Sequence, residues 1–378
     1  MLVYLIAGEP SGDTLGAKLM RALKKADPKL QFAGVGGENM QKEGLTSLFD
    51  ITDLAIMGLA EVIPSIPKVL KRLKQTVEDI KAKQPAAVIT IDSWSFSSRV
   101  HKALRKDKID TLQIHYVAPQ VWAWKKGRAK TMYKYIDHLL TLFPNEPAYF
   151  TPYRLTADCV GHPAIEDIKQ AQTKTKENNL ILLLPGSRHN EVTRLLPVFL
   201  QTAALLKQQN PALEFALPTV KTVETSVRQI IKASQMKDIK IINNPAEKKQ
   251  AFVKAHAAIA ASGTVSLELA LLKIPHIIAY KVAPLTAFIA RHFLKIWSVN
   301  LPNIILNERV IKEMLQESCT PKALAEAITP YLDNKGKARE FFLQKMTELH
   351  QKLGVGKETP SQKAALIILN KIKERPQK

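Results

Sequence analysis

The chain has 378 residues, 46% of them hydrophobic, which is enough to bury the cores of two or three domains, and we take two as the working number. Its 55 Lys and Arg exceed its 34 Asp and Glu by 21, which favours anionic partners: nucleic acid, an anionic membrane surface or a phosphorylated substrate. Cys159 and Cys319 have no CxxC pair and no histidine cluster beside them, so neither a disulfide framework nor a zinc site is indicated, and a reducing cytoplasm is expected. No uncharged apolar run reaches the ~18 residues of a membrane span.

The N-terminal stretch predicts a strand followed by an acidic turn. The apolar run Leu2–Ala7 is too short for a signal peptide, and the turn from Gly8 to Asp13 precedes a helical pattern. The carboxylates of Glu9 and Asp13 would repel a phosphate but can accept hydrogen bonds from sugar hydroxyls. The alternative is that Asp13 caps the helix while Gly8 and Gly12 only turn the chain.

A second strand is predicted at residues 32–35, and it ends at Gly36 and Gly37. Because the full GxGxxG spacing is missing, no dinucleotide cofactor is expected. After Pro64 and Pro67 a helix is predicted with an apolar face and a basic face. The apolar positions are Ile66, Val69, Leu70, Leu73, Val77 and Ile80, and the basic positions are Lys68, Lys71, Arg72 and Lys74. This helix either lies in a membrane interface, with its cations on lipid phosphates, or is a solvated basic helix over a core stripe.

Asp92 directly follows a buried strand predicted at residues 86–91. The carboxyl ends of strands in an α/β sheet are where ligands bind, so Asp92 is a candidate general base. Capping of the next segment together with Ser93 is an equally open interpretation.

The rest of the first half holds two more predicted strands, at residues 111–117 and 139–143, the second being the last of this half. Trp122 and Trp124 fall in the loop between them and either stack on a sugar or base or plug the domain. His162 is interpreted as a hinge residue with a satisfied hydrogen bond, a role facing the cleft being the alternative. The polar stretch that follows Pro163 is interpreted as the interdomain linker.

The second half contains the clearest candidate anion site. The buried strand Leu180–Leu184 runs through Gly186 and Ser187 to Arg188 and into a helical pattern, so backbone N–H groups, the helix dipole and a guanidinium converge there. We interpret this as a pyrophosphate site; the alternative is an ordinary turn with a surface arginine. Pro197 either kinks the following helix or marks its true start.

Further strands are predicted at residues 214–217, 239–242, 257–261 and 276–280. After the third of these, Ser262, Gly263 and Thr264 allow close approach of a ligand, and Glu268 can accept both hydroxyls of a ribose; a glycine turn with a surface glutamate is the alternative. Residues 284–297 form a second candidate interfacial element, Asn300 and Asn303 are placed in a loop, and Thr320 with Pro321 begins a helix.

Six motifs, in order along nearly the whole chain, together resemble the lipid-A-disaccharide synthase family. They are residues 7–13 (AGEPSGD), 91–92 (ID), 117–124 (VAPQVWAW), 161–163 (GHP), 184–188 (LPGSR) and 261–264 (ASGT). The resemblance implies an inverting GT-B glycosyltransferase at the inner face of the bacterial cytoplasmic membrane. It would join UDP-2,3-diacylglucosamine to 2,3-diacylglucosamine 1-phosphate and release UDP.

The expected fold is α/β, with two Rossmann-like domains facing a cleft and a C-terminal helix that packs back on the first domain. The expected boundaries are 1–165 for acceptor binding, 166–350 for UDP-sugar binding and 351–378 for the C-terminal helix and basic tail.

By the resemblance, Asp92, Arg188 and Asn303 match the family's essential residues, and Glu9 matches another active-site position. The candidate substrate-binding residues are Glu9, Ser11, Gly12, Asp13, Trp122, Gly186, Ser187, Ser262, Gly263, Thr264 and Glu268. Ser95 stands where the family commonly has a second Asp, so Asp92 is the lone candidate base. No DxD motif is placed to hold a metal, and neither metal nor cofactor is expected.

The partners expected are the UDP-sugar donor, the lipid acceptor and an anionic membrane surface, and a homodimer stays open. A UDP-sugar epimerase or hydrolase of the same plan, which needs no lipid acceptor, is the nearest alternative. A nucleic-acid-binding protein is disfavoured because the basic residues are spread along the chain and no recognition motif is found.

Overall fold

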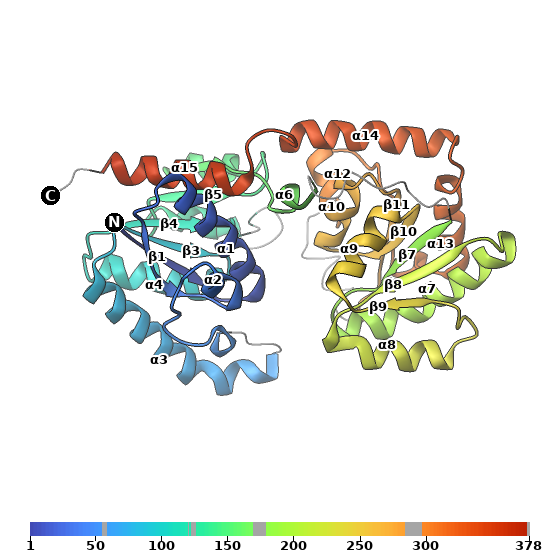
Figure 1. Ribbon diagram of the computed structural model, residues 1–378, viewed down its shortest axis with the longest axis horizontal. Helices are drawn as coiled ribbons and strands as arrows, with labels where there is room; N and C mark the ends of the chain where they lie inside the picture. Colours follow the sequence, from blue (N-terminus) through green and yellow to red (C-terminus); the bar gives the residue numbers. More distant parts are fainter. Residues whose placement is uncertain (55–58, 120, 122–125, 169–178, 284–296, 376–378) are drawn as a thin grey trace. The chain divides into compact units, whose positions relative to one another are not determined.

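The structure is a computed structural model that describes residues 1–54, 59–119, 121, 126–168, 179–283 and 297–375. The chain divides into two compact units, one made of Met1–Pro163 with Gly356–Lys378 and the other of Ala164–Val355 (Figure 1). The chain passes from one unit to the other at 163/164 and at 355/356. The boundaries expected from the sequence were 165/166 and 350/351.

Unit 1 is built on a parallel sheet with the strand order β2-β1-β3-β4-β5-β6. The strands are β1 (Leu2–Ala7), β2 (Gln31–Val35), β3 (Ala87–Ile91), β4 (Leu112–Tyr116), β5 (His138–Thr141) and β6 (Thr156–Cys159). Its principal helices are α1 (Pro10–Ala26), α2 (Glu38–Lys42), α3 (Leu59–Lys83), α4 (Trp94–Lys106), α5 (Ala129–Met132) and α15 (Pro360–Lys373). All strand pairs are parallel, so every carboxyl end lies at the same edge of the sheet.

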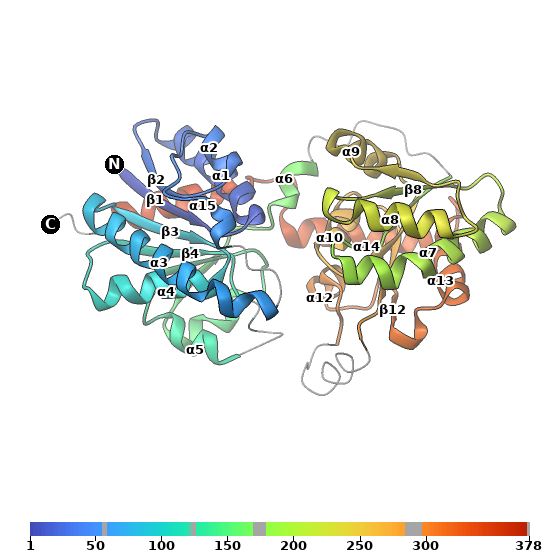
Figure 2. The same cartoon turned by 90° about the horizontal axis from the view of Figure 1, so that it is seen from below.

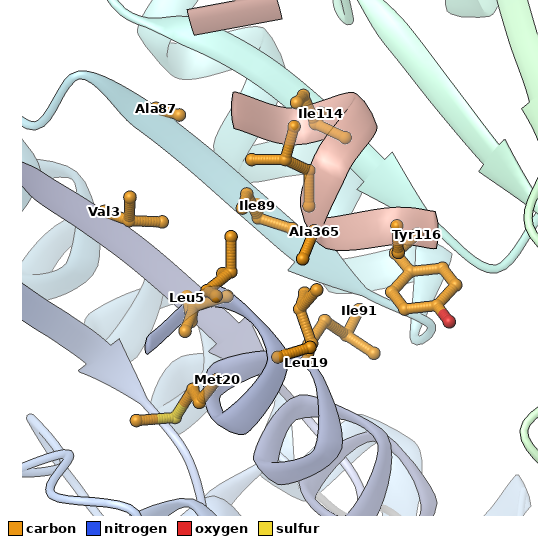
Figure 3. Close-up of a cluster of buried hydrophobic side chains, with 14 of the residues drawn as sticks. Val3, Leu5, Leu19, Met20, Ala87, Ile89, Ile91, Ile114, Tyr116 and Ala365 are labelled. Atoms are coloured by element: carbon orange, nitrogen blue, oxygen red, sulfur yellow. The ribbon is translucent and has the colours of Figure 1, made fainter. Parts of the chain in front are cut away.

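The alternation of side chains along β1 divides the core of unit 1 into two layers. Val3 and Leu5 pack with α1 and α15, whereas Tyr4 and Ile6 pack with α3 and α4 on the opposite face (Figure 1). Figure 3 shows Ala365 of α15 among the side chains of the first layer. The C-terminal helix therefore completes the N-terminal core, as expected.

Unit 2 repeats the plan with the strand order β12-β11-β10-β7-β8-β9, again all parallel. Its strands are β7 (Leu180–Leu184), β8 (Glu214–Pro218), β9 (Lys240–Ile242), β10 (Ala257–Ala261), β11 (His276–Tyr280) and β12 (Glu313–Leu315). Its helices are α6 (Ala164–Ile168), α7 (His189–Gln209), α8 (Lys221–Ala233), α9 (Pro245–Lys254), α10 (Thr264–Leu271), α12 (Leu301–Leu306), α13 (Pro321–Ile328) and α14 (Lys337–Leu353). Helices α7 and α8 cover one face of the sheet, and α10, α12 and α14 cover the other (Figure 2). The expected pair of Rossmann-like α/β domains is confirmed.

Several local predictions are wrong. The first half does not end at β5, because β6 follows it as an edge strand with alternating exposure, and β12 was not predicted at all. Helix α3 begins at Leu59 and runs through Pro64 and Pro67, so its predicted start after these prolines is wrong. Helix α7 begins at His189 and contains Pro197, so of the two alternatives for this helix the start at Pro197 is wrong. A proline removes one backbone hydrogen bond, and a helix of 25 or 21 residues keeps the others.

No helix among the described residues is long and apolar enough to cross a membrane.

Candidate functional site

Asp92 and Ser93 form a strained turn at the carboxyl end of β3. Both residues have left-handed backbone conformations, with φ of 55° and 42°. The Asp92 N–H donates to the Tyr116 carbonyl at 2.8 Å, and the Asp92 carbonyl accepts from Ser97 Oγ at 2.8 Å. Two successive non-glycine residues in this region cost about 1–2 kcal/mol each, so the surrounding fold holds the turn in place.

The carboxylate of Asp92 is half-buried, and one of its oxygens accepts the Ser93 N–H at 2.8 Å. Burial raises the pKa of Asp92 above its ordinary value, the Ser93 hydrogen bond opposes that rise, and the nearby charge of Glu9 adds to it. A carboxylate whose proton affinity is raised is a better general base near neutral pH. The carboxylate is suited to take up a proton and also holds the Ser93 N–H, so both interpretations of Asp92 stay predictions at this point.

Glu9 lies beside this turn because β1 and β3 are adjacent strands. Its exposed carboxylate accepts a hydrogen bond from Ser93 Oγ at 2.9 Å. A Cβ at Gly8 would lie 3.1 Å from the same hydroxyl, a tight contact that a larger residue could make only if Ser93 shifted slightly. The sequence did not predict that Ser93 joins the turn after β1 to the turn after β3. The one indication in the sequence was that Ser93 directly follows Asp92.

The other predicted residues of the first turn divide into two kinds. Ser11 is exposed on the first turn of α1, whereas Gly12 is buried with its Cβ position 3.3 Å from the Ile91 carbonyl. Asp13 is buried, and its two oxygens accept from the backbone N–H groups of residues 37, 39 and 40 and from the Asn39 side chain, at 2.8–3.0 Å. Asp13 lies within α1 and so does not cap that helix, which corrects the capping alternative; it caps α2 instead.

In unit 2, Gly186 and Arg188 form the turn between β7 and α7. Gly186 has φ of 108°, and a Cβ there would lie 2.3 Å from Glu191 Oε2, so the position requires glycine. Ser187 is exposed, and the Arg188 guanidinium is 80% exposed with Nη1 3.0 Å from Glu191 Oε1. Because α7 starts at His189 and continues for 21 residues, the predicted anion site rests on a full helix.

The β10–α10 turn lies beside it, since β7 and β10 are neighbours in the sheet. Gly263 is the N-cap of α10 and is exposed, as is Thr264, and Glu268 is half-buried one turn further on. Ser262 Oγ donates to the Val299 carbonyl at 2.8 Å, which fixes the turn to the segment that precedes α12.

Tyr280, the last residue of β11, is a further residue at this edge that the sequence did not single out. Burial raises its pKa, with the charge of Glu191 acting in the same direction and those of Arg188 and Arg194 in the other. The phenol therefore lies in the electrostatic field of the Arg188–Glu191 pair.

Asn303 is not in a loop, which corrects the prediction: it lies in the first turn of α12 and is fully buried. Its Oδ1 accepts from the N–H groups of Val310 and Ile311 at 3.1 and 2.9 Å. Its Nδ2 donates to the Ile311 carbonyl at 2.9 Å and to Glu313 Oε1 at 2.8 Å. All four hydrogen-bonding positions of the amide are filled by protein, which favours a positioning role over contact with a substrate.

Trp122 and Trp124 lie outside the described residues, as do residues 284–296 of the second interfacial candidate. His162 is half-buried and stacks on Phe143 with ring centroids 5.6 Å apart. In the described part of the chain, no group of three or more His, Cys, Asp or Glu residues is arranged to hold a metal ion.

Two Rossmann-like units, each with a six-stranded parallel sheet, define a protein of the GT-B class. The fold is similar to that of UDP-GlcNAc 2-epimerase from Neisseria meningitidis, solved with UDP-GlcNAc bound (TM-score 0.63, 12% identity, 99% of this chain and 100% of that chain). It is also similar to that of MurG from Acinetobacter baumannii (TM-score 0.57, 14% identity, 99% of each chain). At these identities the likeness shows the fold alone.

Sequence relatives define the family. The family described as lipid-A-disaccharide synthetase matches residues 3–368. The chain is 45% identical to a lipid-A-disaccharide synthase of Paramagnetospirillum magneticum, over 99% of this chain and 98% of the relative, and 42% identical to one of Rhodospirillum centenum, over 99% and 96%. The chain belongs to the lipid-A-disaccharide synthase family. It is a glycosyltransferase of lipid A biosynthesis that uses a UDP-sugar donor and a lipid acceptor, and the epimerase and nucleic-acid alternatives are not favoured.

Proposed function

We propose that the reaction is a single inverting displacement with Asp92 as the general base. Asp92 removes the proton from the 6-hydroxyl of 2,3-diacylglucosamine 1-phosphate while that oxygen attacks the anomeric carbon of UDP-2,3-diacylglucosamine. The glycosidic bond forms as the bond to UDP breaks, which gives the disaccharide 1-phosphate and UDP. The observation that carries this proposal is the half-buried Asp92 carboxylate, held in a strained turn at the sheet edge with its pKa raised by burial.

The donor half of the site is proposed at the carboxyl edge of unit 2. The β7–α7 and β10–α10 turns are neighbours, so the N–H groups near Gly186 and Gly263 and the exposed Arg188 guanidinium can bind one diphosphate. The leaving UDP is an anion, and these donors stabilise the charge that develops on it. Glu268, one turn into α10, is proposed to accept the ribose hydroxyls.

The experiment that tests the reaction uses the purified protein with both diacylglucosamine substrates, and with the donor alone. Mass spectrometry should find the disaccharide 1-phosphate and UDP only when both substrates are present. An altered or hydrolysed sugar from the donor alone would support the epimerase or hydrolase alternative and contradict the proposal.

We also propose that the protein binds the inner face of the cytoplasmic membrane through α3. Ile66 and Leu70 are 45% and 52% exposed on this helix, and Lys71 and Lys74 are exposed beside them. Exposed apolar side chains next to lysines suit a surface of acyl chains and anionic head groups. Anionic lipid head groups also provide a partner for the excess of basic residues, so nucleic acid is not needed to explain that excess. A homodimer stays a prediction.

A further inference from the structure

We propose that Glu313 is a positioning residue for the donor diphosphate: it holds the 298–300 segment, and this segment holds the β10–α10 turn through Ser262. The inference rests on the proposed donor site and names a residue that acts on that site without touching the substrate.

Glu313, the first residue of β12, collects three hydrogen bonds on its carboxylate. Oε1 accepts from Ser298 Oγ and, at 2.8 Å, from Asn303 Nδ2, and Oε2 accepts the Val299 N–H at 3.0 Å. Every one of these contacts requires an acceptor, and both oxygens are needed to satisfy them. The carboxylate therefore fixes the 298–300 segment more completely than a neutral side chain of the same shape would.

Val299 carries this constraint to the functional turn. Its N–H is held by Glu313, and its carbonyl accepts Ser262 Oγ at 2.8 Å. Ser262 directly precedes Gly263, the N-cap of α10, where the space around the Cβ position is open. Because the Ser262 hydroxyl is engaged with Val299, it anchors the turn and leaves the backbone N–H groups to face the phosphates.

A second contact attaches the same segment to α10. Asn300 is 1% exposed, and its Oδ1 lies 2.6 Å from Ser266 Oγ, which also lies 3.0 Å from His276 Nε2. The segment is thus bonded on both sides of the helix start, at Ser262 and at Ser266. A shift of residues 298–300 would displace the turn and the first turn of α10 together.

Asn303 positions the Glu313 carboxylate in this arrangement. Its Nδ2 shares Glu313 Oε1 with Ser298, and its Oδ1 binds the backbone that leads into β12. Asn303 thereby orients the carboxylate that holds Val299. The residue that resembles the family's essential asparagine acts, on this account, through Glu313.

The test is UDP binding, measured by isothermal titration calorimetry on the full-length protein and on Glu313→Gln. A glutamine has only one acceptor oxygen, so either Val299 or the Asn303 and Ser298 pair loses its partner. We expect UDP to bind about tenfold more weakly, the effect of one lost buried hydrogen bond. The KM for the donor should rise similarly while the KM for the acceptor stays close to the wild-type value. The thermal unfolding temperature should fall by only a few degrees, the cost of one lost buried hydrogen bond.

Glu308→Gln is the matched control. It also removes one negative charge, in the connection that leads from α12 to β12, but Glu308 pairs with Lys345 at 2.6 Å and not with the 298–300 segment. Its UDP affinity should equal that of the wild type. Equal UDP affinity of Glu313→Gln and wild type would overturn the inference, whereas a wild-type protein that does not bind UDP would overturn the proposed donor site itself.

Ser262→Ala provides an independent variant if Glu313→Gln does not fold, because it breaks the same link from the other side. It should weaken UDP binding to a similar degree. If both single variants fold, the double variant should be no weaker than the weaker single one, since one connection is already lost. Additive losses would contradict the inference.

Discussion

The hydroxyl of Ser93 donates a hydrogen bond to the carboxylate of Glu9 at 2.9 Å, and so joins the turn after β1 to the turn after β3. Ser93 also gives its N–H to Asp92, so one residue orients the proposed base and a second negative charge beside it. The two carboxylates are therefore electrostatically linked, and the protonation of Asp92 depends on Glu9.

Replacement of Glu9 by Gln should move the acid limb of the kcat/KM pH profile to lower pH. The negative charge of Glu9 raises the pKa of Asp92, and the amide removes that charge while its oxygen still accepts from Ser93. A base with a lower pKa loses its proton at lower pH, so activity persists further into the acid range. The control is Glu38→Gln, an exposed carboxylate on α2. A profile that is unmoved, or moved upward, would contradict this role.

Replacement of Glu146 by Gln should stabilise the protein at pH 8.5 but not at pH 5. Glu146 is 4% exposed and accepts the N–H groups of Leu142 and Phe143, and burial raises its pKa to about 7. Since the folded-state pKa is above the unfolded one, the contribution of Glu146 to wild-type stability falls as pH rises through this range, by on the order of 2–3 kcal/mol. Denaturant unfolding at both pH values measures the difference. For the control Glu340→Gln, at an exposed position, the difference in free energy of unfolding from the wild type should be the same at both pH values. If that difference is also the same at both pH values for Glu146→Gln, the effect is refuted.

Acid should destabilise the protein through three buried histidines. Burial lowers the pKa of His101 and of His276 to about 4 and that of His115 well below its ordinary value. The unfolded chain takes up these protons near pH 6.5 and the folded chain does not, so stability is present above that pH and is lost as pH falls toward 4.

The measurement is the free energy of unfolding between pH 7.5 and pH 5. His276→Asn should reduce its pH dependence by about one proton. His189→Asn, at an exposed histidine on α7, should leave the dependence as it is. An equal pH dependence in the wild type and in His276→Asn would show that His276 is not held neutral, because all other titrating groups are shared by the two proteins.

The double substitution Ile66→Ser and Leu70→Ser should weaken binding to anionic lipid vesicles. Both side chains are exposed on α3, so their removal takes apolar area from the proposed membrane contact without opening the core. Vesicle sedimentation should show a loss of roughly tenfold or more, with turnover of detergent-dispersed substrates preserved. Exposed Leu366 on α15 provides the control, as Leu366→Ser. Equal vesicle binding by wild type and double variant would exclude α3 as the contact.

The sequence predicted those parts of the fold that depend on continuous apolar runs. β7 and β10 are buried along their whole length, and their bounds match the predicted ones because nothing polar interrupts them. β6 and β12 were missed because both are edge strands, which are only partly buried and can therefore contain polar residues. Asp158 in β6 and Glu313 in β12 interrupt the apolar run by which the other strands were recognised. Periodicity does not reveal strands of three or four residues with mixed polarity.

The local structure of the candidate site was predictable where one motif makes one turn, as at Gly186 with Arg188 and at Asp92. It was not predictable where residues distant in the sequence share a hydrogen bond. Asp13 caps a helix more than twenty residues away in the sequence. The amide of Asn303 makes its hydrogen bonds to Glu313 and to the backbone before it. Such pairings depend on the order of strands in the sheet, which a linear pattern does not contain.

Asp92→Asn tests the central claim most directly, because the amide keeps the size of the side chain and its acceptor for Ser93 but does not take up a proton. Turnover should fall by roughly 10²–10⁴, the usual contribution of a positioned base, while UDP affinity stays at the wild-type value. Asp110→Asn, which removes a carboxylate that pairs with Arg375, should leave turnover unchanged. Near-normal turnover in Asp92→Asn would contradict the assignment of Asp92 as the base.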